Sequence, residues 1–152
     1  MIRNELQTAL KDAMRARDER ALSTVRLILA ALKDRDIAAR GTGNADGIPD
    51  EEIRGMLGKM IKQRQESAAM YEQGGRPELA QQEMDEAAVI KRFLPAELDE
   101  AQTAAAVSQV IDELGAGSIK DMGRVMAELR RRHAGAMDFA RASEFAKERL
   151  CA

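Results

Sequence analysis

Apolar residues recur along this chain every three or four positions, which is the period of an α-helix. In the first segment Ile2, Leu6, Leu10 and Met14 recur every fourth residue and form one apolar stripe. The same pattern returns in six further segments, so the sequence predicts seven helices. Their approximate ranges are 2–17, 19–39, 51–73, 77–93, 100–114, 119–133 and 139–150.

Residues that favour helix ends stand at the borders of these segments. Asp18, Asp50 and Ser118 are expected N-caps, because a short polar side chain can accept a hydrogen bond from a free backbone N–H of the first turn. Asp99 with Gln102 three residues later is typical of a capping box. The helix borders therefore follow from local chemistry as well as from the apolar pattern.

Leu94-Pro95 is the most pronounced boundary in the chain, since a proline ends a helix and disfavours helical backbone in the residue before it. We expect an N-terminal domain over residues 1–94 and a second domain over residues 95–152. The predicted fold is all-α, with an N-terminal four-helix domain followed by a small three-helix C-terminal domain.

Composition agrees with a helical fold. Only 3% of the 152 residues are aromatic, there is no Trp, and runs of β-branched residues that would indicate strands are missing. The nine Met residues are expected to fill the core between helices, because their flexible side chains adapt to irregular gaps.

Charge and cysteine content point to a location. The net charge is −2, and the single Cys151 leaves no partner for an intrachain disulfide. The N-terminal residues lack the apolar core of a signal peptide, and no apolar run approaches the ~20 residues of a membrane span. We therefore expect a cytoplasmic protein that does not enter a membrane.

No arrangement of residues predicts catalysis. His133 is the only histidine, so a metal site made of His and Cys lacks ligands, and no phosphate-binding P-loop occurs. We expect no metal and no cofactor. A pair of carboxylates assembled by the fold remains an alternative, so whether the chain is an enzyme stays open, with binding as the favoured interpretation.

Basic residues form two candidate nucleic-acid contacts. Lys59 and Lys62 share one face of the third segment, where the alternative is an ordinary solvated face. Arg64 differs, because it falls within the apolar stripe, and we expect it to form a structural ion pair with Glu83 or Glu86.

The sixth segment holds the densest basic cluster. Its five cations could contact a phosphate backbone, although cations at a helix C-terminus also simply complement the helix dipole. These candidate residues are Lys120, Arg124, Arg130, Arg131 and Arg132.

Four motifs together resemble the YqeY-like proteins of the GatB/YqeY family, in the right order and over nearly the whole chain. They are Leu22 to Lys33, Lys59 to Ser67, Tyr71 to Leu79 with Phe93-Leu94-Pro95, and Ser118 to Met126.

The resemblance implies two helical domains, the second similar to the tail of the GatB subunit of the glutamine-dependent aspartyl/glutamyl-tRNA amidotransferase. A non-catalytic, tRNA-associating accessory module is the function it implies, with tRNA as the partner. The alternative is a protein–protein interaction module that docks on an aminoacyl-tRNA synthetase or an amidotransferase subunit. The family's association with carbon–nitrogen ligase activity, with glutamine as amido-N-donor, belongs to the larger enzyme.

One loop departs from the family pattern. Many members carry Gly-Arg-Ala-Asp-Gly before the last helix, whereas this chain reads Gly135-Ala136-Met137-Asp138-Phe139. Because the loop arginine is absent, any RNA contact would have to use other residues, such as Arg130 to Arg132.

Overall fold

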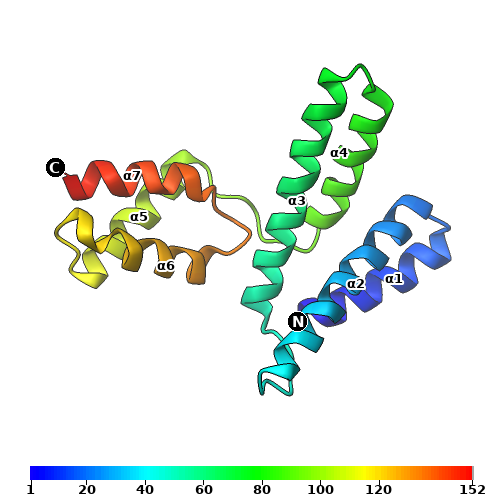
Figure 1. Ribbon diagram of the computed structural model, residues 1–152, viewed down its shortest axis with the longest axis horizontal. Helices are drawn as coiled ribbons and strands as arrows, with labels where there is room; N and C mark the ends of the chain where they lie inside the picture. Colours follow the sequence, from blue (N-terminus) through cyan, green and yellow to red (C-terminus); the bar gives the residue numbers. More distant parts are fainter. Residues whose placement is uncertain (152) are drawn as a thin grey trace. The chain divides into compact units, whose positions relative to one another are not determined.

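The computed structural model describes residues 1–151. Over that range its regular elements are all helices and none is a strand, which confirms the predicted all-α class and its seven helices (Figure 1). A short 3₁₀ turn, η1, precedes the sixth helix. The elements are α1 (Ile2–Ala16), α2 (Glu19–Gly41), α3 (Asp50–Gln73), α4 (Pro77–Lys91), α5 (Glu100–Leu114), η1 (Ile119–Asp121), α6 (Met122–His133) and α7 (Phe139–Cys151).

The contacts divide the chain into two compact units, Met1–Pro95 and Ala96–Ala152. We call them the first unit, which holds α1 to α4, and the second unit, which holds α5 to α7 with η1. Each unit has a core of its own.

In the first unit α3 and α4 form a long helical hairpin, and α2 packs against both α1 and α4 (Figure 1). The core is made of fully buried aliphatic side chains, each of which stabilises the fold by roughly 1.5–3 kcal/mol when removed from water. Its completely buried members are Leu6, Ile28, Ile53, Leu57 and Ile90.

In the second unit α5, α6 and α7 each pack against the other two. Val107, Val125 and Leu129 lie at the centre of its core. The loop that departs from the family pattern contributes to this core, because Ala136 and Met137 are buried and the Ala136 carbonyl accepts a hydrogen bond of 2.7 Å from the Leu98 backbone N–H.

Most predicted helix ends agree with the structure to within two residues, and the differences include three, at α3, α4 and α6. The Asp18 cap accepts a hydrogen bond from the Ala21 N–H, and Asp99 and Gln102 form the predicted capping box. However, α3 begins at Asp50 itself, after Pro49 as N-cap. The fourth helix ends at Lys91 rather than at residue 93.

The third difference lies before α6. We expected Ser118 to cap the sixth helix, but residues Ile119–Asp121 form the 3₁₀ turn η1 first. The Asp121 carboxylate accepts hydrogen bonds from the backbone N–H groups of Gly117, at 3.0 Å, and Ser118, at 3.3 Å. Tighter turns of this kind are common at helix termini.

The expectation that the methionines fill the core is correct for only some of them. Three are buried, whereas four are exposed, among them Met14, which the apolar stripe of the first helix had placed inward. Helix periodicity gives a direction for each side chain, but another element must pack there to bury it. The buried methionines are Met56, Met126 and Met137, and the exposed ones are Met1, Met14, Met70 and Met84.

A partly buried ion pair that the sequence did not indicate joins three parts of the first unit. Arg3 on α1 donates two hydrogen bonds to the Asp36 carboxylate on α2, at 2.6 and 2.8 Å, and a third of 2.7 Å to the Ile48 carbonyl. Asp36 also accepts from the Ile48 N–H at 3.0 Å. The Arg3 guanidinium is the main cause that lowers the pKa of Asp36 to about 2.

Candidate functional site

Carboxylates of the second unit surround the basic cluster on α6. Arg131 and Arg132 both form ion pairs with Glu128 one turn earlier, and Arg132 also pairs with Glu113 on α5. Hydrogen bonds from Arg131 and Arg132 lower the pKa of Glu128 to about 2. Arg132 therefore links α5 and α6, and the charges of both arginines are partly neutralised.

The remaining cations of this cluster are less concentrated than the sequence implied. Arg124 forms an ion pair of 3.0 Å with Asp121, and the Arg130 guanidinium lies 5.7 Å from the centre of the Phe139 ring. Lys120 is exposed. Residues 96–152 contain eight Lys and Arg against ten Asp and Glu, so the second unit has no overall basic charge to attract a phosphate backbone.

The two lysines on α3 are exposed, but they belong to the other unit. Lys59 and Lys62 lie in the first unit and the five cations discussed above in the second. The seven candidate nucleic-acid contacts thus do not share one compact unit.

Arg64 is held by Glu86 on α4, one of the two expected carboxylates. Its Nε donates to the Glu86 carboxylate at 3.2 Å, and the two side chains are only 14% and 13% exposed. A second nitrogen donates to the Met60 carbonyl at 3.2 Å, and Arg20 from α2 lies 3.7 Å from the other Glu86 oxygen. This arrangement links α2, α3 and α4, and it is structural rather than a free binding group.

An apolar groove of about 360 Å³ lies where α1 and α4 both pack on α2. Alanine side chains of α1 and α2 form much of its lining, together with Val25, Val89 and Phe93. Asp12, Asp18 and Arg92 are its polar lining residues, and they do not form a constellation of acid, base and nucleophile.

Within the first unit, one side of α2 has no other helix packed against it. Ala21, Val25, Ile28 and Leu32 are buried on the side that faces the core. On the opposite side Leu27 and Ile37 are 49% and 55% exposed. We define the outer face of α2 by the exposed residues at this side, which are Ser23, Leu27, Ala30, Asp34, Ile37 and Gly41.

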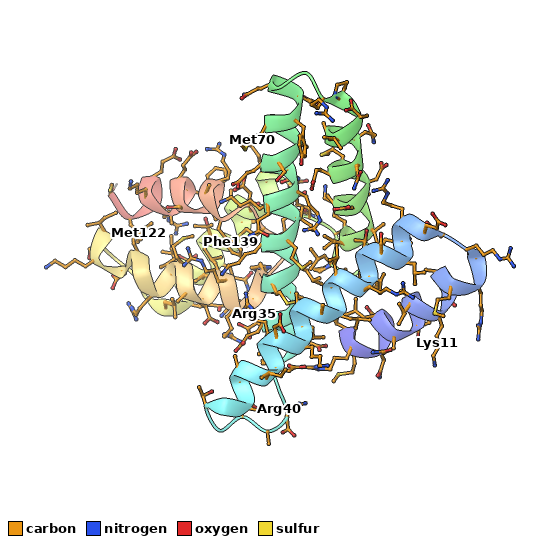
Figure 2. All side chains as sticks on the ribbon, turned by 45° about the vertical axis from the view of Figure 1, so that its right-hand side comes forward. Lys11, Arg35, Arg40, Met70, Met122 and Phe139 are labelled. Carbon is orange, nitrogen blue, oxygen red and sulfur yellow. The ribbon has the colours of Figure 1, made fainter. Side chains whose placement is uncertain are left out.

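Three cations follow one edge of this outer face. Arg26, Lys33 and Arg40 are all exposed, with Arg40 near the C-terminal end of α2 (Figure 2). None of the three forms an ion pair with another residue between 1 and 151. We call these residues the basic edge of α2.

This surface was not among the binding sites predicted from the sequence, which gave no role to Leu27 or Ile37. The signal was present, because the edge cations recur every seven residues and Ala30 and Ile37 share that spacing. When a helix already has one buried apolar face, exposed apolar residues along a second face indicate a surface that can bind another chain.

Within the described residues no group of three or more His, Cys, Asp and Glu side chains is placed to hold a metal ion. No helix of that range is long and apolar enough to cross a membrane. The arrangement of exposed apolar and basic groups on α2 is suited to binding.

A family model described as "Yqey-like protein" matches residues 3–150. The chain belongs to the YqeY-like protein family. This confirms the family expected from the four sequence motifs. This match does not show the expected similarity between the second domain and the amidotransferase tail.

Curated relatives of this YqeY-like chain carry the name "Altered inheritance of mitochondria protein 41, mitochondrial". The one from Clavispora lusitaniae is 36% identical over 100 residues, which cover 64% of this chain and 55% of the relative. The one from Lachancea thermotolerans is 30% identical over 112 residues, covering 72% and 57%. The chain thus matches little more than half the length of these relatives.

These names correct two expectations about the YqeY-like chain. The tRNA-associating function is contradicted, because the relatives are named for the inheritance of mitochondria and not as amidotransferase tails. Docking on a synthetase or an amidotransferase subunit has no support either. The ion pairs on α6 agree with this, since carboxylates already bind Arg131 and Arg132, two of the predicted phosphate contacts.

The cytoplasmic location is contradicted as well, because the relatives are named as mitochondrial proteins. The expectation was based on the absence of a signal peptide and of a membrane span. These two absences do not distinguish the cytoplasm from a mitochondrial compartment.

Proposed function

We propose that this YqeY-like protein works by binding a helical segment of a partner protein on the outer face of α2. The observation that carries the proposal is the pair of exposed aliphatic residues, Leu27 and Ile37, on the side of α2 turned away from the core. Burial against a partner would remove both side chains from water, and each buried methylene group contributes about 0.8 kcal/mol.

The form of this surface favours a helix as the occupant. At ~100° per residue, Leu27, Ala30 and Ile37 fall within a sector of roughly 80°, which matches the narrow seam that one helix presents to another. Ala30 lies between the two larger residues, so a second helix can approach closely at the middle of the seam.

We also propose that residues 1–94 and 95–152 are two domains, four-helix and three-helix, and that the first of them holds the binding surface. The separate hydrophobic clusters of the two units support this. The exposed backbone around Pro95 to Glu97, which lies outside any helix, supports the boundary.

The test uses a photo-crosslinking amino acid at Ala30, in the full chain expressed in its native cells, followed by purification of the crosslinked partner. The partner should bind the unmodified protein directly when both are pure. Leu27→Asp and Ile37→Asp should each weaken this binding at least tenfold, because a carboxylate buried without a partner is costly.

Met70→Asp is the matched control, because Met70 is an exposed apolar residue of the same unit that lies outside this surface. It should leave the binding unchanged. Equal binding by Leu27→Asp, Ile37→Asp and the unmodified chain would overturn the proposal, as would equal loss with Met70→Asp.

A further inference from the structure

We infer that the segment bound on α2 is an amphipathic helix with an acidic residue at every seventh position, and that one basic residue of this helix faces Asp34. The inference rests on the proposed function and specifies the chemistry of the partner. It follows from the regular spacing of charge along the outer face.

The basic edge has the spacing that a second helix can match. Arg26, Lys33 and Arg40 are seven residues apart, so their Cα atoms lie about 10.5 Å from one another along the axis. Two packed helices keep their contacts in register when contacts repeat every seven residues. A seven-residue repeat can be assigned along α2 with Leu27 and Ala30 at its two apolar contact positions. In this assignment all three cations occupy the flanking position from which side chains form salt bridges between paired helices.

These cations need a charged partner when the surface is covered. None of them forms an ion pair in the described chain, although the charge of Arg40 contributes to the lowered pKa of Asp36. A helix packed on Leu27 and Ile37 would reduce the contact of all three cations with water. Acidic residues opposite them would compensate the lost hydration and favour the correct register. An uncharged helix would leave the cations without compensation, and a basic one would be repelled.

Asp34 lies in the seam between Ala30 and Ile37 and is exposed. A single polar seam position of this kind fixes the register of a helix pair, at a cost in stability. A cation on the partner at this level would pair with the carboxylate.

The same residue argues against an anionic membrane as the occupant. A helix that lies in a membrane surface inserts bulky apolar residues from its apolar face. The outer face of α2 instead has Ala30 and Asp34 between its two large residues, with Ser23 and Gly41 beyond them on either side. A Cβ placed at Gly41 would meet no atom within 4 Å, so the backbone of another chain can approach this end of the face.

The test measures the binding of two synthetic helical peptides to the full chain, by fluorescence anisotropy at low salt. Both have about three heptads with leucine at the seam. One carries Glu at every seventh flanking position and one seam Lys, and the other has these charges reversed. The acidic peptide should bind at least tenfold more tightly, and added salt should reduce the difference.

A charge swap makes the test specific to α2. The triple variant Arg26→Glu, Lys33→Glu, Arg40→Glu should bind the acidic peptide at least tenfold more weakly than the unmodified chain does. The control triple variant Lys11→Glu, Lys59→Glu, Lys62→Glu makes the same change in net charge at exposed positions elsewhere in the first unit. It should keep the preference for the acidic peptide.

The outcomes separate the inference from the proposed function. If Leu27→Asp abolishes binding of the crosslinked partner while the triple swap at the basic edge has no effect, the function stands and the acidic helix is wrong. Equal binding of both peptides, or tighter binding of an RNA duplex or of anionic lipid vesicles that depends on the same three cations, also overturns the acidic helix.

Discussion

At the scale of single residues, the strongest polar interaction of the first unit is the contact between Arg3 and Asp36, which sequence periodicity could not reveal. In the sequence, Arg3 simply follows the apolar Ile2, and Asp36 follows the charged run Lys33-Asp34-Arg35. Their partnership depends on α1 and α2 lying side by side, so only the fold brings the two groups together.

Asp36→Ala should lower the free energy of unfolding by about 2–3 kcal/mol, because it leaves the Arg3 guanidinium without its carboxylate in a site that is largely buried. Denaturant unfolding followed by circular dichroism measures the change. Asp34→Ala, two residues away and exposed, should change stability by less than about 0.5 kcal/mol.

The same pair predicts how stability depends on pH. The pKa of Asp36 is about 2 in the folded chain and close to 3.8 when unfolded, so its contribution is fully present above about pH 4. It is lost as the pH falls through 2. Between these values the unmodified protein should lose more stability than Asp36→Ala, and parallel pH profiles would show that the ion pair is not formed.

At the scale of elements, the helices themselves follow from local sequence, and one of them can be stabilised by a single substitution. Gly55 lies inside α3, where glycine is unfavourable because it loses the most backbone freedom on folding. A Cβ at this position would meet no atom within 4 Å. Nothing in the packing of the described chain therefore requires glycine there.

Gly55→Ala should raise the free energy of unfolding by roughly 0.5–1 kcal/mol, measured as a higher thermal midpoint. Gly47→Ala is the opposite case. The backbone of Gly47 has a φ of 81°, and a Cβ there would lie 2.4 Å from an Asp36 oxygen, so this change should destabilise the chain. A fall in stability with Gly55→Ala would mean that α3 is packed differently.

At the scale of the whole molecule, the division into two compact units after Pro95 has a measurable consequence. The segment between α4 and α5 is not helical, and Glu97 within it is exposed. A protease specific for glutamate, used at low concentration, should cleave first at Glu97. Mass spectrometry should then find two fragments, each with helical circular dichroism. First cleavage within α2 or α3 would argue against two domains.

The sequence by itself determined the helical class, most helix borders and the family, because these depend on residues that are neighbours along the chain. Caps such as Asp18 and Asp99 and the spacing of apolar positions act within a few residues, so no tertiary information is needed to read them. The motifs that identify the YqeY-like family are likewise runs of consecutive residues.

Only the tertiary structure decided which charges and apolar groups are free. The arginines of α6 looked like a phosphate contact in the sequence, yet Glu113 and Glu128 bind two of them across and along helices. Leu27 and Ile37 had no role in the sequence pattern, yet they are 49% and 55% exposed on a side of α2 that no other helix of the first unit covers. Whether a side chain is paired or exposed depends on what packs beside it in space, and the order of residues along the chain does not specify that.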